Sequence, residues 1–286
     1  MFKPKVLILG SSGMLGHQLY FFLSQNSNFQ LFDISKSMKL TNNTSLYDIK
    51  ESFFLNYILK LKPDFIINCI GILIKESINN PDEAIYINSY LPHKLVKIAN
   101  EIKATLVHLS TDCVFSGKRG SYKETDHRDG DDIYALSKIL GEVLDNNHLT
   151  LRTSIVGPEI RKKNEGLFDW FMKQKTNIFG YTKVFWSGVT TFELSKAIMW
   201  SINNKITGLY HVTNNLPISK YELLLLFNKY SKKNLEIIPD DKIVSDKTFI
   251  DTKNFLDYKI PSYDDMISVM VNNIFKNKVL YPHYNL

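Results

Sequence analysis

The chain has 286 residues, of which 44% are hydrophobic and 13% aromatic, so it can fold as one large α/β domain or as a domain with a smaller partner. Its net charge is +6, but the basic residues are scattered and nearly all are lysine, which argues against a nucleic-acid binder. The two cysteines, Cys69 and Cys113, lie far apart and indicate neither a disulfide framework nor a metal site. No apolar stretch approaches the ~20 residues of a membrane span and no signal-peptide layout is visible, so we expect a cytoplasmic protein without a membrane partner.

The first predicted element is a buried strand at 5–9, which leads directly into three glycines and an amphipathic helix to about residue 25. The glycines, Gly10, Gly13 and Gly16, have the spacing Gly-x-x-Gly-x-x-Gly. Strand, glycine loop and helix in this order are typical of a dinucleotide site, because glycines permit a tight turn and let the backbone approach a pyrophosphate at the helix N-terminus. The alternative is a plain strand–helix turn.

The second predicted strand, 29–34, carries signals for both nicotinamide cofactors. Asp33 lies 17 residues past Gly16, which fits an acidic side chain on an adenosine ribose and favours NAD. Ser35 and Lys36 follow at once and suit a 2′-phosphate instead, which favours NADP. From these residues alone the choice of cofactor stays open.

The chain then alternates helices with short apolar strands: helix 45–61, strand 65–71, helix 84–101 and strand 105–109. This alternation predicts an α/β fold with a doubly wound parallel sheet. Ligands of such sheets bind beyond the carboxyl ends of the strands, where Gly10, Gly71 and Thr111 fall.

A proton-delivery site is predicted between 108 and 142. Tyr134 and Lys138 are four residues apart at the start of a predicted helix, so they lie on one face of it. An ammonium beside a phenol lowers the tyrosine pKa from its usual value of about 10. The hydroxyl of Thr111, on the preceding strand, can hold a carbonyl against that phenol. The spacing of Tyr and Lys is common by chance, and the alternative is a surface lysine beside a half-buried tyrosine.

The regular alternation fades after 149–153. We therefore predict a dinucleotide-binding domain at 1–153, with contributions from segments near 184–212, and a smaller C-terminal α/β domain at 154–286 that binds the substrate. Within the latter, Ser219 and Glu222 form a predicted capping box that opens an apolar helix at 223–230.

Several motifs together point to one family. The chain contains, in order, GSSGMLGHQL, KPDFIINCIG, a helix with Asn88, HLSTDCVFSG, YALSK, LRTS and SGVTT, spread over roughly residues 5–215. As a set they resemble the extended short-chain dehydrogenase/reductase superfamily and, within it, the dTDP-4-dehydrorhamnose reductase group of nucleotide-sugar reductases. The resemblance implies a Rossmann-type domain that binds NADPH, or NADH, and a C-terminal domain that binds a sugar nucleotide. It also allows a homodimer, although no interface signature is visible.

The resemblance assigns roles to individual residues. Tyr134 would give a proton to the sugar C4 oxygen as hydride arrives at C4, Lys138 would lower the tyrosine pKa and hold the nicotinamide ribose, and Thr111 would orient the carbonyl. Substrate contacts would come from Thr111, Asp112, Cys113, Ile155 and Thr190, and no metal is implied. Besides Tyr134 and Lys138, the cofactor contacts would be Gly10, Ser12, Gly13, Met14, Leu15, Gly16, Asp33, Ser35, Lys36, Cys69, Gly71 and Asn88.

Two departures from the family pattern fall in the predicted sugar pocket. Cys113 stands where the reductases commonly carry Tyr, and Ile155 stands where they carry Trp. In the related GDP-fucose synthases a Cys at the former position is the acid/base that epimerises a carbon next to the ketone. A thiol with its ordinary pKa of about 8.5 suits that task. The alternative is that Cys113 is a small apolar filler.

The expected function is therefore NAD(P)H-dependent reduction of a UDP- or dTDP-linked 4-keto-6-deoxyhexose to a rhamnose-like sugar nucleotide. A 2-acetamido sugar reduced after C3 epimerisation is a more specific case. The first alternative is a non-catalytic, NADP-binding regulatory subunit that resembles the β subunit of methionine adenosyltransferase. A second alternative is a 4,6-dehydratase, which would carry an acidic residue just after the triad hydroxyl, as Asp112 is here. The resembling reductases carry Asp at this position too, so Asp112 does not distinguish the two activities.

Overall fold

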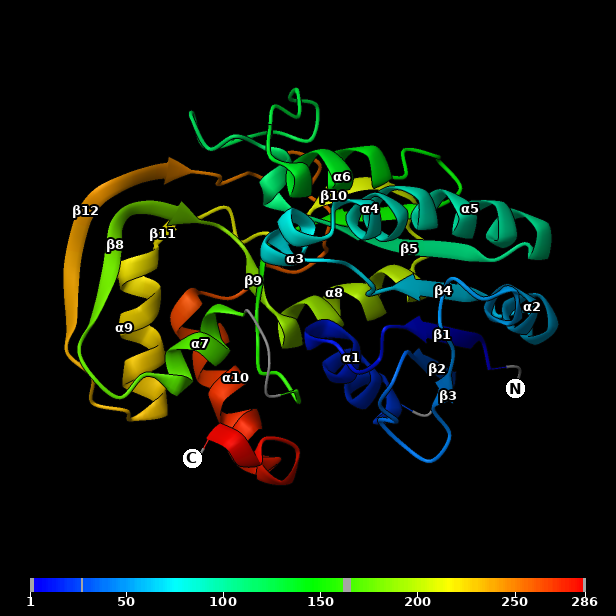
Figure 1. The fold of residues 1–286 in the computed structure, drawn as a ribbon, viewed down its shortest axis with the longest axis horizontal. Coiled ribbons are helices and arrows are strands. Elements are labelled where there is room, and N and C mark those ends of the chain that lie inside the picture. Colours follow the sequence, from blue (N-terminus) through cyan, green and yellow to red (C-terminus); the bar gives the residue numbers. More distant parts are fainter. Residues whose placement is uncertain (1–2, 27, 162–165, 285–286) are drawn as a thin grey trace.

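The computed structural model describes residues 3–26, 28–161 and 166–284. Its centre is a seven-stranded sheet in the order β10-β6-β5-β4-β1-β2-β3, and every pairing in it is parallel (Figure 1). The order 3-2-1-4-5-6 within it is that of a Rossmann fold, so the predicted fold class is confirmed. The strands are β1 (Lys5–Leu9), β2 (Gln30–Ser35), β3 (Ser45–Leu46), β4 (Phe65–Asn68), β5 (Thr105–Ser110), β6 (Leu149–Arg152) and β10 (Gly208–His211).

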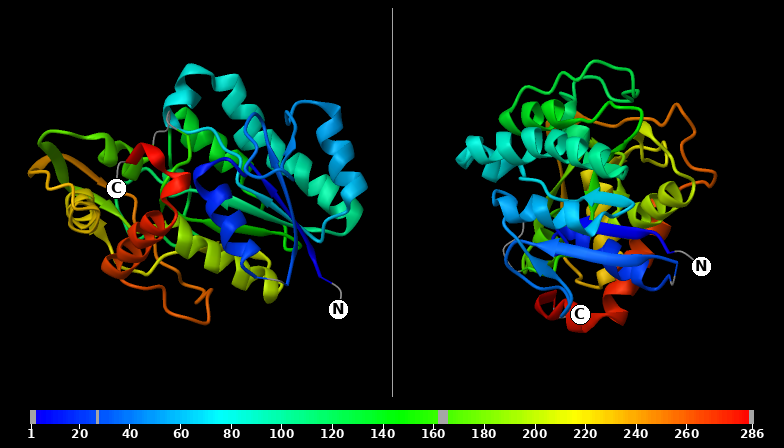
Figure 2. Two further views of the ribbon diagram at one scale, coloured as in Figure 1. Left: turned by 90° about the horizontal axis from the view of Figure 1, so that it is seen from below. Right: turned by 90° about the vertical axis from the view of Figure 1, so that its right-hand side faces the viewer.

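Helices cover both faces of this sheet, as Figures 1 and 2 show. On one face, α1 (Met14–Ser24) and α8 (Thr191–Asn203) pack over Val6 and Ile8. On the other, α2 (Ser52–Leu61) and α5 (Leu91–Ile102) pack over Leu7 and Leu9. Successive side chains of a strand point to opposite faces, so a strand covered on both faces is apolar throughout, as the run KVLIL is.

The segment expected as one helix at 84–101 is interrupted. It consists of α4 (Pro81–Ala84), the π-helix η1 (Ile85–Tyr90) and α5, and α3 (Ile74–Asn79) precedes it. Pro92 has no N–H to donate to the Asn88 carbonyl four residues earlier, so the α-helical ladder cannot continue unbroken there. The helix expected at 45–61 is likewise shorter: its first residues form β3, and α2 begins at Ser52.

The C-terminal half of the chain both extends the central sheet and builds a second layer. The segment 184–212 contributes α8 and β10, and β10 pairs with β6 at the edge of the sheet. A separate three-stranded sheet carries α9 and lies beyond the strand ends, on the side away from the N-terminus (Figure 1). The predicted capping box at the start of α9 is confirmed. These elements are β7 (Ile155–Val156), α7 (Leu167–Lys173), β8 (Ile178–Trp186), β9 (Val189–Thr190), β11 (Ile218–Ser219), α9 (Lys220–Ser231), β12 (Ile237–Asp246) and α10 (Tyr263–Lys276).

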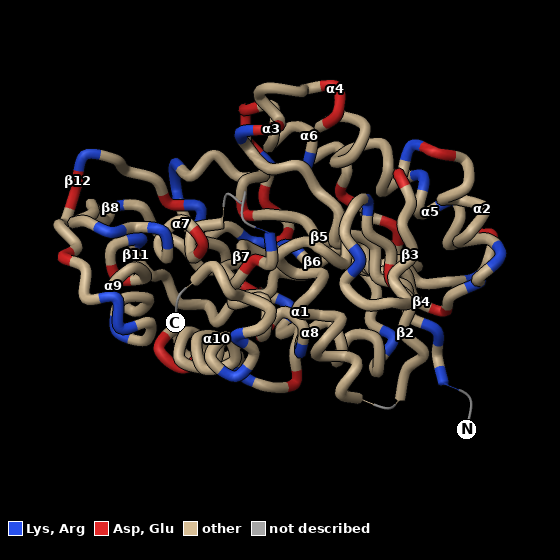
Figure 3. Tube along the Cα trace, turned by 60° about the horizontal axis from the view of Figure 1, so that its bottom comes forward, with Lys and Arg blue, Asp and Glu red and all other residues tan. Residues whose placement is uncertain are grey.

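Charged residues of both signs are interspersed along the chain, without one basic face in the view of Figure 3. None of the helices in the described ranges is long and apolar enough to cross a membrane. The described residues also contain no group of three or more His, Cys, Asp or Glu side chains placed to hold a metal ion.

One glycine lets α6 (Ile133–Gly141) approach the π-helix. A Cβ on Gly141 would lie 1.8 Å from the Asn88 carbonyl oxygen, a backbone atom that cannot step aside. We expect Gly141→Ala to lower the free energy of unfolding by about 1–3 kcal/mol, measured by urea denaturation. Gly71→Ala is the matched control, since a Cβ there would meet only Asn88 Oδ1 at 3.6 Å. Equal stability of the two variants would contradict this packing account.

Candidate active site

The structure brings Thr111, Tyr134 and Cys113 together at the carboxyl end of β5. Thr111 directly follows that strand and precedes the 3-10 turn η2 (Asp112–Val114). Tyr134 lies in the first turn of α6, which begins after the N-cap Asp132, whose side chain accepts a 2.8 Å hydrogen bond from Ala135 N. The Thr111 hydroxyl lies close enough to the Tyr134 phenol and the Cys113 thiol to lower the pKa of each. One hydroxyl therefore lies near two groups that can carry a proton.

Tyr134 is held as a neutral phenol. Burial raises its pKa, the neighbouring Cys113 and Asp112 raise it further, and only the Thr111 hydroxyl acts in the opposite direction. Lys138 is not among the main causes of the Tyr134 pKa shift, so its predicted effect on that pKa stays a prediction. The Lys138 ammonium donates to the Leu109 carbonyl oxygen at 2.7 Å, and burial lowers the pKa of Lys138 to about 8.

Cys113 is also protonated at neutral pH. Burial raises the pKa of its thiol to about 12, and the charge of Asp112 adds to this effect, while Lys247 and the Thr111 hydroxyl oppose it. The premise that this thiol titrates near neutrality is therefore wrong, and its part in catalysis stays a prediction. Asp112 itself is buried and accepts the Thr111 hydroxyl at 3.0 Å.

Two lysines from the C-terminal half lie near enough to this group to interact with it electrostatically. The charge of Lys247 acts on Cys113, and the pKa of Lys220 responds to Asp112 and Cys113. Burial lowers the Lys220 pKa, and its ammonium lies 5.2 Å from the ring centre of Trp186. Neither lysine could be singled out from the sequence, because lysines are common throughout this chain and only the fold brings these two close to the site.

The two remaining predicted substrate residues lie in neighbouring strands. Ile155 is half-buried in β7, where it pairs with Val189 of β9. Thr190 is buried and caps α8, because its hydroxyl accepts a hydrogen bond from Glu193 N at 3.3 Å. A capping role thus occupies the Thr190 hydroxyl that was expected to contact the sugar.

A cavity of about 190 Å³ lies between the glycine loop and the carboxyl ends of β1, β2 and β4. Gly10 has a positive φ of +80°, and a Cβ on Gly16 would lie 2.2 Å from the Gly10 carbonyl oxygen, so both positions require glycine. Seven predicted cofactor residues line this cavity: Gly10, Ser12, Gly13, Ser35, Lys36, Cys69 and Gly71. It is also lined by Ile34, Tyr47, Asp48, Ile49, Lys50, Ile70, Glu83, Ile87 and Arg161.

The residue expected to contact the adenosine ribose does not reach this cavity. Asp33 is 2% exposed, is absent from the lining, and its Oδ2 has no hydrogen-bond partner among the described residues. The cavity wall at the end of β2 is formed instead by Ser35, whose hydroxyl lies 2.7 Å from that of Ser12, and by Lys36. Of the two alternatives left open by the sequence, this geometry favours the pair suited to a 2′-phosphate.

The six other predicted cofactor residues are likewise absent from the lining: Met14, Leu15, Gly16, Asn88, Tyr134 and Lys138. The Asn88 side chain bonds both backbone polar groups of Ile72, at 2.9 and 3.0 Å, and the Ser137 hydroxyl at 3.1 Å. It therefore braces η1 against α6, the helix that carries Tyr134.

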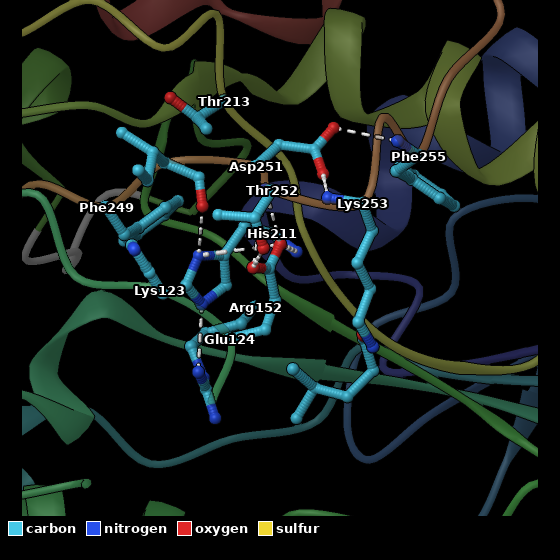
Figure 4. Close-up of polar contacts among 12 residues, drawn as sticks. Lys123, Glu124, Arg152, His211, Thr213, Phe249, Asp251, Thr252, Lys253 and Phe255 are labelled. Carbon is cyan, nitrogen blue, oxygen red and sulfur yellow. Dashed lines mark hydrogen bonds and ion pairs between the residues drawn. The ribbon is translucent and has the colours of Figure 1, made fainter. Parts of the chain in front are cut away.

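A buried ion-pair network lies next to the candidate active site and joins the end of α6 to β6 and β10. The guanidinium of Arg152 donates two 2.8 Å hydrogen bonds to Glu142 and one of 2.9 Å to His211 Nε2. Figure 4 shows Arg152 and His211 side by side. Arginine can only donate, so Nε2 accepts, and the His211 proton lies on Nδ1 and binds the Ile250 carbonyl oxygen at 2.8 Å. Burial, together with the charge of Arg152, lowers the His211 pKa to about 4, so the ring is neutral. Ser110 also donates to Glu142, at 2.6 Å.

The network borders a second cavity, of about 330 Å³, near the edge strand β10. Glu124, Arg152 and Lys253, which Figure 4 labels, are among the residues that line it. The three hydrogen bonds of the Arg152 guanidinium described above are all made to Glu142 and His211, so Arg152 already uses these donors within the protein and not toward a ligand in this cavity.

We expect Glu142→Gln to lower the free energy of unfolding by about 3–5 kcal/mol at pH 7, because it leaves Arg152 buried with an unpaired charge. Burial alone would raise the Glu142 pKa, but Arg152, Ser110 and Arg128 together lower it. The stabilisation is therefore complete above the unfolded pKa of about 4.3 and is lost as the pH falls through the lower, folded pKa.

The difference from wild type, measured by urea denaturation, should shrink as the pH falls below about 4. Glu101→Gln, at an exposed position of α5, is the matched control. A difference that stays constant from neutral to strongly acidic pH would show that the charge of Glu142 does not account for its contribution.

Comparison with known proteins agrees with the motifs. A family model described as RmlD substrate binding domain matches residues 4–242. Methionine adenosyltransferase 2 subunit beta of Bos taurus is 26% identical over 234 residues, covering 77% of this chain and 70% of that protein. The dTDP-4-dehydrorhamnose reductase of Salmonella typhimurium is 29% identical over 157 residues, covering 53% and 51%. The crystal structure of dTDP-4-dehydrorhamnose reductase from Bacillus anthracis in complex with NADP superposes with a TM-score of 0.82 at 23% identity, over 96% and 99% of the two chains.

Proposed function

The chain belongs to the RmlD substrate binding domain family, and on this premise we propose that it is an NADPH-dependent reductase of a nucleotide-linked 4-keto sugar. The observation that carries the proposal is that Thr111 and Tyr134 lie close together at the same sheet edge as the glycine-lined cavity. The similarity to dTDP-4-dehydrorhamnose reductases supports it.

The cavity fits a dinucleotide. Gly10 and Gly16 let the loop turn tightly into α1, and this turn places backbone N–H groups at the N-terminus of α1, where a pyrophosphate can bind. Ser35 and Lys36 at the end of β2 suit the 2′-phosphate that distinguishes NADPH from NADH. The NADP bound to the Bacillus anthracis relative supports the same choice. When bound, this cofactor supplies the hydride.

The remaining chemistry falls to the side chains of this chain. Tyr134, kept protonated by burial, gives its proton to the C4 oxygen, and the Thr111 hydroxyl holds that oxygen in line with the phenol. Lys138 lies one turn further along α6 and would hold the nicotinamide ribose. The high pKa of Tyr134 makes the phenol a weak acid before substrate binds. Transfer of its proton therefore depends on the negative charge that develops on the C4 oxygen during reduction.

The substrate we propose is a UDP- or dTDP-linked 4-keto-6-deoxyhexose, reduced to a rhamnose-like sugar nucleotide. Lys220 and Lys247, which approach the site from the C-terminal half, match an anionic substrate. Cys113 and Ile155 in place of larger aromatic residues leave space for a bulkier sugar, such as a 2-acetamido sugar. In this proposal the segment 154–286 is mainly the sugar-nucleotide-binding part.

A second candidate is a non-catalytic, NADP-binding regulatory subunit. The match to the β subunit of methionine adenosyltransferase, over 77% of this chain, favours it. The two candidates differ in one requirement, because only the reductase needs the Tyr134 hydroxyl.

We expect Tyr134→Phe to lower kcat by roughly 10²- to 10⁴-fold, since it removes a general acid and keeps the ring. NADPH binding, measured by fluorescence titration, should stay close to that of wild type. Tyr90→Phe, at an exposed position of η1, is the matched control and should keep full activity. Turnover near the wild-type rate in Tyr134→Phe would exclude Tyr134 as the proton donor.

If Cys113 exchanges the proton next to the ketone, the substrate should incorporate deuterium at C3 in D2O, detected by NMR. Cys113→Ser should abolish this exchange and leave reduction of an already epimerised substrate measurable. Cys69→Ser, in the nucleotide cavity, is the control for the loss of a thiol. No exchange with the wild-type protein would remove the epimerase step and leave Cys113 as a filler.

A further inference from the structure

An arginine from outside the dinucleotide-binding segment reaches the nucleotide cavity. Arg161 follows β7 and lies 149 residues from Ser12, yet its guanidinium donates to the Ser12 hydroxyl. The Ser12 hydroxyl in turn lies 2.7 Å from that of Ser35, at the end of β2. Glycine loop, second strand and Arg161 therefore meet at one corner of the cavity.

Cations and carboxylates both line the cavity. Lys36 is paired with Asp48 at 3.0 Å, and Lys50 is paired with Glu83, so each of these lysines has a carboxylate beside it on the cavity wall. The Arg161 guanidinium reaches the Ser12 hydroxyl inside the cavity. Among the described residues of the lining, the cation at the corner with Ser12 and Ser35 is therefore an arginine.

We propose that Arg161 binds the 2′-phosphate of NADPH and sets the preference of this chain for NADPH over NADH. The inference rests on the proposed function. In a Rossmann fold the adenosine ribose lies at the end of the second strand, and an arginine nearby accommodates a 2′-phosphate. A guanidinium presents a planar fork of donors that matches a phosphate, and the Ser12 and Ser35 hydroxyls add two further donors at the same corner.

The C-terminal turns hold the segment that carries Arg161 in place. The Glu159 N–H donates to the Tyr284 hydroxyl at 2.8 Å, and the Glu159 carboxylate accepts Gly166 N at 3.0 Å. Tyr281, in the same C-terminal part of the chain, lies 2.9 Å from His17 Nε2 on α1, just behind the glycine loop. Burial lowers the His17 pKa to about 4, so the neutral ring donates from Nδ1 to the Gly13 carbonyl oxygen and accepts the Tyr281 hydroxyl at Nε2. Cofactor choice is thereby tied to residues more than 100 positions from the glycine motif.

The test is a pair of fluorescence titrations, with NADPH and with NADH, on the full chain. Arg161→Gln should weaken NADPH binding by roughly 10- to 100-fold, the worth of a charge-assisted contact, and change NADH binding by less than about 2-fold. Tyr284→Phe removes only the hydroxyl that holds Glu159 and should cause a smaller loss in the same direction. Arg119→Gln, at an exposed arginine outside the cavity, is the matched control and should change neither affinity.

Each other outcome overturns the inference in a recognisable way. Equal weakening of both cofactors by Arg161→Gln would assign Arg161 to a phosphate that NADPH and NADH share, or to the fold. Unchanged affinities would remove it from the site. If the wild-type protein bound neither cofactor, the proposed function itself would fail, whereas wild-type binding with an unselective Arg161→Gln variant would leave the proposed function standing and remove only this inference.

Discussion

The active site depends on one buried ion pair, Arg152–Glu142. Arg152 ends β6, and Glu142 directly follows α6, the helix that carries Tyr134 and Lys138. Ser110, which precedes Thr111, donates to the same carboxylate. The pair therefore fixes the distance between the strand end that presents the threonine hydroxyl and the helix that presents the phenol. A buried charge pair of this kind contributes little net stability by itself, but loss of either partner is costly, so it specifies one geometry.

Elements far apart in sequence complete both halves of the site. The glycine loop and β2 form most of the nucleotide cavity, but Arg161 closes it from beyond β7, and Tyr281 and Tyr284 hold that arrangement from the end of the described chain. On the substrate side, α9 begins with Lys220, which faces Asp112 and Cys113. The second layer thus touches the Rossmann sheet at its carboxyl edge, where both ligands of the proposed reaction would meet.

Local sequence patterns predicted the features that depend on local physics. The glycine spacing predicted a cavity at the end of β1, and Tyr134 and Thr111 were placed together because strand ends and helix starts meet at one edge. A prediction failed where burial decided the outcome, because burial raises the pKa of the Cys113 thiol to about 12. Burial also leads the Lys138 ammonium to donate to the Leu109 carbonyl oxygen, a contact that the spacing did not predict. The spacing of residues in the sequence shows neither how deeply a side chain is buried nor which residues contact it in the fold. For the same reason the positions of Arg161 and Lys220 near the two parts of the site could not be predicted from the sequence.

The most direct test follows the absorbance of NADPH, and then NADH, in the presence of dTDP- and UDP-linked 4-keto-6-deoxy sugars, including the 2-acetamido form. The account predicts oxidation of NADPH with at least one of these substrates, and a much slower reaction with NADH. Binding of NADPH without oxidation by any of them would contradict the reductase and would favour the regulatory-subunit function instead.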